Sequence, residues 1–180
     1  TALIEFPAAG AQFVDGDNDA MYLTGGSHAL TDCLIGWPLD DGVDAGGGSG
    51  VMSFTRCWFE STYHEGFALS TSNQRHLNGN VTLNCGQGIE CGYGSLRVEA
   101  DGCFSTANAV GVRFGDCYDW DYDGFLHVTN SLLLFNKRDI WGRAWDTWEH
   151  HLDQMDFRDN LLTAADPLHP ANGVWDPAAD

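Results

Sequence analysis

The chain has 180 residues, of which 43% are hydrophobic and only 19% charged, a composition typical of one folded domain over residues 1–180 rather than a disordered chain. Against 8 basic residues stand 26 acidic ones, and the net charge of −18 excludes nucleic acid and anionic membranes as partners by repulsion. No apolar run reaches the ~20 residues of a membrane span, and the first six residues do not read as a signal peptide.

Taken in chain order, a five-residue segment recurs from Asp19 onward: a polar residue, a small residue, an apolar residue, any residue and a second apolar residue. The chain has 22 glycines, which suit tight turns between such segments. Their first apolar positions are 22, 24, 22, 23 and 28 residues apart. These positions are Met21, Val43, Phe67, Ile89, Val112 and Ile140, the last in a degenerate copy.

A second column keeps nearly the same offset from the first, with spacings of 24, 23, 23, 28 and 29 residues. It begins at Cys33, Cys57, Asn80, Cys103, Ser131 and Asn160. A period in the low twenties with short apolar strands and glycine turns is typical of a β-solenoid. The two columns therefore predict an all-β, right-handed parallel β-helix of about six coils, with repeats over 15–165.

The C-terminal part, about 141–180, is expected to cap the solenoid, because an open end exposes unpaired strand edges. Trp141, Trp145, Trp148 and Leu152 have helical spacing and indicate either a short capping helix or an irregular loop. These tryptophans are expected mainly to pack over the end of the solenoid, with stacking on sugar rings as the alternative.

The cysteines are interpreted as buried free thiols. Cys33 and Cys57 lie on adjacent coils, where in-register parallel neighbours rarely have disulfide geometry, and Cys57 and Cys103 lie two coils apart, roughly 9 to 10 Å. Cys85 is less determined, and a bridge between Cys91 and Cys117 stays open.

Between each pair of inward apolar residues, one residue points outward, and a second outward column precedes it. Together with Asp40 and His64, the two columns are expected to form an exposed, carboxylate-rich stripe across neighbouring coils. The outward positions are Tyr22, Asp44, Ala68, Glu90, Arg113 and Trp141, preceded by Asp19, Asp41, Glu65, Gln87, Val110 and Arg138.

The segments 40–44, 64–70, 86–90 and 110–115, with a closing segment at 166–177, resemble parallel β-helix repeats of the pectate-lyase-like superfamily. The resemblance covers roughly residues 15–178 and is specific for fold more than for activity, because this architecture carries lyases, hydrolases, epimerases and inert domains. It implies a secreted or cell-surface bacterial protein that acts on a polysaccharide, with Ca²⁺ as cofactor.

By this resemblance, Asp41, Asp44, Glu65 and Glu90 hold metal or substrate and Arg113 is the candidate base. From the residues alone, His64, Glu65 or Asp41 serves as the acid/base, while Tyr22 and Trp141 contact substrate. The alternatives are structural: Glu90 and Arg113 form a surface salt bridge, Asp40 and Asp41 form a turn, and His64 is a turn histidine.

The segment Asp119-Trp120-Asp121-Tyr122-Asp123-Gly124 matches the opening of a calcium loop, in which Asp119, Asp121 and Asp123 would be ligands. Position twelve is Asn130 rather than Glu, so a complete EF-hand is not expected. The alternative is a polar, aromatic hairpin.

The sequence therefore predicts a calcium-dependent polysaccharide lyase or hydrolase with its site on the acidic stripe. The rival prediction is a non-catalytic structural or adhesive solenoid module of a larger surface protein. An ice-binding face is a third and weaker alternative, since neither outward column carries a regular Thr-x-Thr array. The oligomeric state is not predicted.

Overall fold

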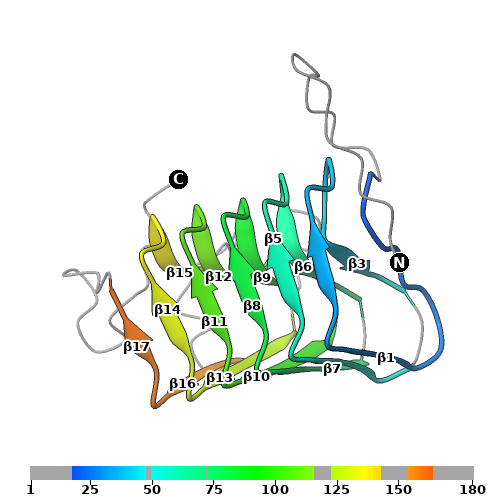
Figure 1. Cartoon of the computed structure of the whole chain (residues 1–180). Coiled ribbons are helices and arrows are strands. Elements are labelled where there is room, and N and C mark those ends of the chain that lie inside the picture. Colours follow the sequence, from blue (N-terminus) through cyan, green and yellow to red (C-terminus); the bar gives the residue numbers. More distant parts are fainter. Residues whose placement is uncertain (1–17, 48–49, 72, 116–122, 143–153, 164–180) are drawn as a thin grey trace.

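The computed structural model describes residues 18–47, 50–71, 73–115, 123–142 and 154–163. Within these ranges the chain forms a parallel β-solenoid of three sheets, so the predicted all-β fold is confirmed (Figure 1). In each coil the chain passes once through each sheet, and we call the sheets B, C and A in the order in which the chain meets them. Complete coils are fewer than the six predicted, because the last turn has no described strand in sheet A.

The strands of each sheet stack in chain order. Sheet B contains β1 (His28–Thr31), β4 (Met52–Thr55), β7 (Asn73–Asn78), β10 (Leu96–Asp101), β13 (Phe125–Thr129) and β16 (Met155–Arg158). Sheet C contains β2 (Leu34–Gly36), β5 (Trp58–Glu60), β8 (Val81–Leu83), β11 (Phe104–Thr106), β14 (Leu132–Leu134) and β17 (Leu161–Leu162). Sheet A contains β3 (Val43–Ala45), β6 (Glu65–Leu69), β9 (Gln87–Cys91), β12 (Val110–Phe114) and β15 (Arg138–Gly142).

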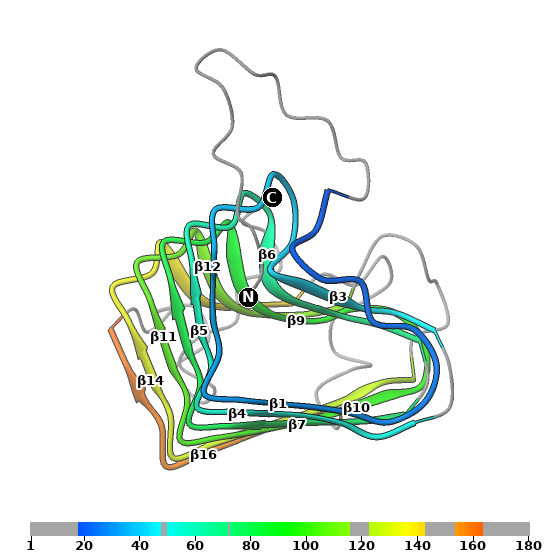
Figure 2. The same cartoon turned by 45° about the vertical axis from the view of Figure 1, so that its right-hand side comes forward.

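The predicted pile of apolar residues is present in sheet A. Val43 pairs with Phe67, Phe67 with Ile89, Ile89 with Val112 and Val112 with Ile140, and all five are at most 5% exposed. Figure 2 shows the three sheets enclosing the core that these side chains share with sheets B and C. Residues one sequence period apart therefore lie directly above one another in adjacent coils.

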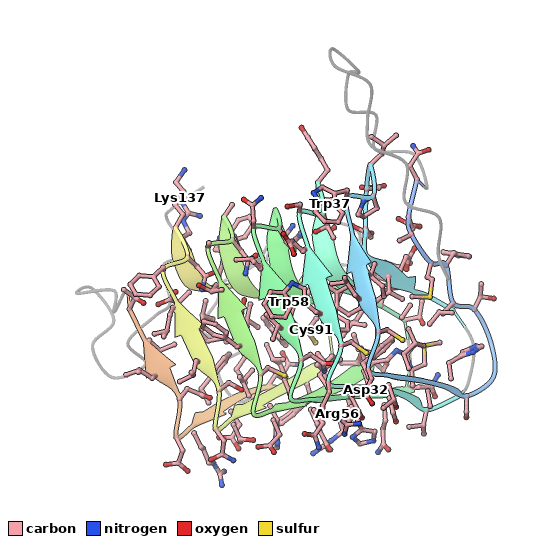
Figure 3. All side chains as sticks on the ribbon, in the orientation of Figure 1. Asp32, Trp37, Arg56, Trp58, Cys91 and Lys137 are labelled. Atoms are coloured by element: carbon pink, nitrogen blue, oxygen red, sulfur yellow. The ribbon has the colours of Figure 1, made fainter. Side chains whose placement is uncertain are left out.

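The corner from sheet B to sheet C is the most regular part of the coil. It always consists of two residues, and the first has a φ between 50° and 62°. These first residues are Asp32, Arg56, Gly79, Gly102, Asn130 and Asp159. Figure 3 shows Asp32 and Arg56 beside each other at this corner, where Arg56 Nε donates to Asp32 Oδ1 over 2.7 Å.

The second residue of that corner forms the predicted inner ladder of small polar side chains. Asn80 Oδ1 accepts the N–H of Cys57 at 2.8 Å, and Asn160 Oδ1 accepts the N–H of Ser131 at 2.8 Å. Ser131 Oγ likewise accepts the N–H of Cys103 at 3.0 Å. The ladder thus satisfies backbone donors that no strand partner reaches.

The prediction of buried free thiols is confirmed for Cys57 and Cys103, whereas Cys33 is free but only half-buried. Cys85, whose state was left open, is free and buried. Burial raises the pKa of the Cys103 thiol to about 11, so it stays protonated and packs as a small hydrophobe. Cys91 is buried in β9, whereas Cys117 lies outside the described residues, so a bridge between them stays a prediction.

One core position carries an arginine that the sequence patterns did not single out. Arg75 occupies an inward position of β7, paired with Met52 and Val98, and is 0% exposed. Its guanidinium donates to the carbonyl oxygens of Gly50 and Ala45, each at 3.2 Å. It thereby holds the corner between sheets A and B.

Two expectations about the C-terminal part have different outcomes. Trp141 lies in strand β15 rather than in a helix. Trp145, Trp148 and Leu152 lie outside the described residues, as does most of the expected cap. No helix among the described residues has both the length and the apolar character needed to cross a membrane.

Candidate functional site

The outer face of sheet A carries the site residues because β6, β9 and β12 each have a glycine as their second residue. A Cβ on Gly88 would lie 2.4 Å from Ser105 Oγ and 2.5 Å from Thr82 Oγ1, so Gly88 faces the interior, as does Ile89 after it. Two consecutive inward positions leave Gln87 and Glu90 on the same outer face. The two predicted outward columns therefore form one surface.

The same place in the last coil explains its degenerate motif. Asp139 replaces the glycine that Gly111 provides one coil earlier, and it is 1% exposed. Its Oδ1 accepts from Asn136 Nδ2 at 2.9 Å and its Oδ2 accepts the N–H of Thr163 at 2.7 Å. A buried carboxylate is tolerated at this position because each of its two oxygens accepts a hydrogen bond.

Seven side chains from consecutive coils meet on this face, and we call them the sheet A cluster. They are Asp40, Asp41, His64, Glu65, Gln87, Glu90 and Arg113. The structure therefore brings together all four predicted catalytic residues.

Glu65 is at the centre of the cluster. Its Oε2 lies 2.5 Å from His64 Nδ1, and its Oε1 accepts from Gln87 Nε2 at 2.5 Å and lies 3.8 Å from Arg113 Nη1. Its own N–H donates to Asp41 Oδ1 over 2.8 Å. One carboxyl group thus links three coils.

The cluster is buried, which corrects the expectation of an exposed stripe. Glu65, Glu90 and Arg113 are 1%, 6% and 4% exposed, and Asp41 is 8% exposed. The side chain of His64, at 42%, is the exposed edge. The repeat pattern identifies the outward residues correctly, but it does not encode what covers them.

Burial changes the acid chemistry of two carboxyl groups. Removal from water, reinforced by the neighbouring Glu65, raises the pKa of Asp41 to about 10. Removal from water, followed by the charge of Glu90, raises the pKa of Glu65 well above its usual range. Asp41 therefore favours the protonated form at neutral pH, and Glu65 holds its proton more tightly than an exposed glutamate does.

Arg113 is suited to carry a positive charge rather than to accept a proton. Its Nη1 lies 3.0 Å from Glu90 Oε1, and its guanidinium lies over the ring of Trp141, 5.3 Å from the centroid. The pair with Glu90 is buried, so it is not the surface salt bridge weighed above. An arginine paired with a carboxylate keeps its proton, which disfavours Arg113 as a base.

The predicted substrate contacts lie along the same sheet. Tyr22 pairs with Asp44 at the first coil and is 60% exposed, while Asp44 is half-buried. Trp141 lies at the other end, half-buried, with Arg113 and Arg138 over its ring. These residues are in register with Glu90 and Arg113 but do not enter the hydrogen bonds around Glu65 that are described above.

The metal prediction is only partly within the described residues. Asp119 and Asp121 lie outside them, and Asp123 is exposed. Within them, Asp40, Asp41 and His64 bring donor atoms within 4.8 Å of one another. Calcium prefers oxygen ligands and imidazole suits transition metals, so this trio does not fit the predicted Ca²⁺.

Comparisons with known proteins add no family. The chain matches no family model, no curated protein and no solved structure.

Proposed function

We propose that the protein acts on an extracellular polysaccharide, with the sheet A cluster as its reaction centre and His64 as the group that exchanges a proton with the substrate. The carrying observation is the contact of His64 Nδ1 with the buried Glu65 carboxyl at 2.5 Å, while the His64 side chain is 42% exposed. A carboxyl group that fixes one ring nitrogen orients the other, as in acid/base pairs of hydrolases.

Arg113 supplies positive charge in this proposal rather than accepting a proton. Because Glu90 and Trp141 hold its guanidinium in place, it is ready to stabilise negative charge that develops on the substrate. Tyr22, Asp44 and Trp141 extend the site along the stack, in the direction in which a polymer would lie. The reaction class is general acid/base cleavage by a lyase or a hydrolase.

Two histidines with similar exposure provide a matched test. His64→Ala removes the proposed proton carrier, whereas His76→Ala removes a 39% exposed side chain that pairs with Glu99 on sheet B at 3.1 Å. On a panel of polysaccharides, assayed with and without Ca²⁺, we expect turnover by wild type and His76→Ala and a loss of about 10²–10⁴-fold in His64→Ala. Equal rates in both variants, or no turnover of any glycan, would overturn the proposal.

The second candidate is a structural or adhesive module of a larger surface protein. It is favoured by the network itself, in which Glu65, Gln87, Glu90 and Arg113 pair with one another across coils. Such a network holds adjacent coils together without any substrate. A wild-type protein that binds glycans without cleaving them, and whose His64 variant binds equally well, is the outcome expected from this candidate.

A further inference from the structure

A line of apolar side chains runs along the outer face of sheet C, and we call it the sheet C stripe. Each member is the first residue of its strand and pairs with the equivalent residue of the next coil. The members are Leu34, Trp58, Val81, Phe104, Leu132 and Leu161. The register therefore fixes them in one straight column along the solenoid axis.

The stripe is open to solvent. Leu34, Trp58, Leu132 and Leu161 are 62%, 41%, 42% and 58% exposed, and Val81 and Phe104 are half-buried. Figure 1 shows the strands of sheet C with no described strand of the other sheets in front of them, and Figure 3 labels Trp58 on this face. Contiguous apolar surface of this kind marks an interaction site in soluble proteins.

The face is also nearly uncharged. Glu60 is the only charged residue among the strands of sheet C, all of which the structure describes, in a chain of net charge −18. Its Oε2 accepts a hydrogen bond from Trp58 Nε1 at 3.1 Å. Glu60 therefore orients the indole ring, which restricts its rotation before any partner arrives.

The dimensions restrict what can lie on this stripe. Six strands about 4.8 Å apart span about 24 Å, and three residues of strand give a width of about 10 Å. That footprint is well below the ~800 Å² that each partner buries in a stable protein pair. A second copy would also bring another net charge of −18, and an anionic lipid surface would repel the chain.

We propose that the sheet C stripe is a binding platform for an extended, neutral polysaccharide that lies along the solenoid axis. Sugar rings present flat C–H faces that pack on apolar and aromatic side chains, and an uncharged polymer meets no repulsion from this chain. Trp58 and Phe104, two coils or about 10 Å apart, are the aromatic contacts of the platform. The platform is separate from the sheet A cluster and does not depend on its chemistry.

The test is retention of the full chain on insoluble cellulose and chitin and on a gel containing soluble β-glucan. We expect wild type to bind at least one of these, Trp58→Ala with Leu132→Ser to lower its affinity by about tenfold or more, and Val51→Ser to leave it unchanged. Val51 is a matched control because it is 41% exposed just before β4 of sheet B. Circular dichroism and thermal midpoints verify that each variant folds.

Four results would overturn the platform: no binding by wild type, equal binding by the double variant, a dimer in light scattering that the same substitutions abolish, or binding to phosphatidylcholine vesicles. Wild-type turnover separates this inference from the proposed function. Turnover of soluble glycans without retention contradicts the platform alone, and retention without turnover contradicts the reaction centre alone.

Discussion

The outer faces of sheets A and C are built on the same stack, yet they reverse the usual distribution of residue types. On sheet A, Glu65, Glu90 and Arg113 are almost fully buried, while on sheet C, Leu34 and Leu161 are more than half exposed. Burying charge and exposing apolar surface both cost free energy, so neither face is explained by folding alone. The core of the solenoid therefore defines its fold, whereas the two outer faces differ in composition and burial for reasons that the stack does not dictate.

The largest expected effect concerns the reaction proposed for sheet A. Glu65→Gln keeps the shape of the side chain but removes the acid that orients His64, so turnover is expected to fall by about 10²–10⁴-fold in steady-state assays. Glu99→Gln, on the exposed face of sheet B, serves as control and is expected to retain activity. Full activity of Glu65→Gln would contradict the proposed reaction centre on sheet A.

The next effect tests whether burial on sheet A has an energetic consequence. Glu90→Gln leaves the buried Arg113 without its nearest carboxylate, and we expect the free energy of unfolding in urea to fall by about 3 kcal/mol. Asp156→Asn breaks the more exposed pair with Arg158, at 2.7 Å, and is expected to cost far less. Similar losses in the two variants would show that the sheet A pair behaves like a surface pair.

The third effect is a pH dependence specific to the buried face. Folded Asp41 holds its proton up to about pH 10, whereas the unfolded chain releases it near 3.8, so wild-type stability falls as pH rises through this window. Asp41→Asn removes that penalty and keeps the acceptor for the Glu65 N–H, so at pH 8 its free energy of unfolding is expected to exceed that of the wild type.

Thermal unfolding between pH 4 and 9 checks this prediction. Asp101→Asn is the control, because Asn130 and Thr129 lower the pKa of Asp101 and its titration falls below the window. If the stability of Asp41→Asn depends on pH as steeply as that of the wild type, another group of the sheet A cluster causes the dependence.

The smallest effect is expected on sheet C. Leu132 is 42% exposed, so Leu132→Ala is expected to change the free energy of unfolding by less than about 0.5 kcal/mol. Its neighbour Leu133 is 0% exposed, and Leu133→Ala is expected to cost about 2–5 kcal/mol. A large loss at Leu132 would mean that the stripe is kept for stability rather than for binding.

The sequence contains enough information for the stack and for the membership of the site. The spacing of Val43, Phe67, Ile89 and Val112 predicts which residues lie above one another, and the same spacing brings Glu65, Glu90 and Arg113 together. Burial could not be predicted, because alternation separates inside from outside but does not say what covers the outside. The calcium prediction rests mainly on residues outside the described ranges.

The sheet C stripe is also encoded in the sequence. Its six members directly follow the residues of the second column, so they share the spacing of that column: Leu34, Trp58, Val81, Phe104, Leu132 and Leu161. Arg75 gave no signal, because a charged residue at an alternating position reads as outward. The repeat pattern includes a small residue at the position of Gly88, but the pattern alone does not show that both Gly88 and Ile89 point inward.

The length of the chain between strands varies most at one corner of the solenoid. The corner from sheet B to sheet C never changes, while the corner from sheet A to sheet B ranges from three residues between β6 and β7 to twelve between β15 and β16. New loops can therefore be grafted or diversified next to the strands of Glu90 and Arg113 with the scaffold unaltered. Under the proposed function, such changes at this corner are a route by which selectivity for different glycans could evolve or be engineered.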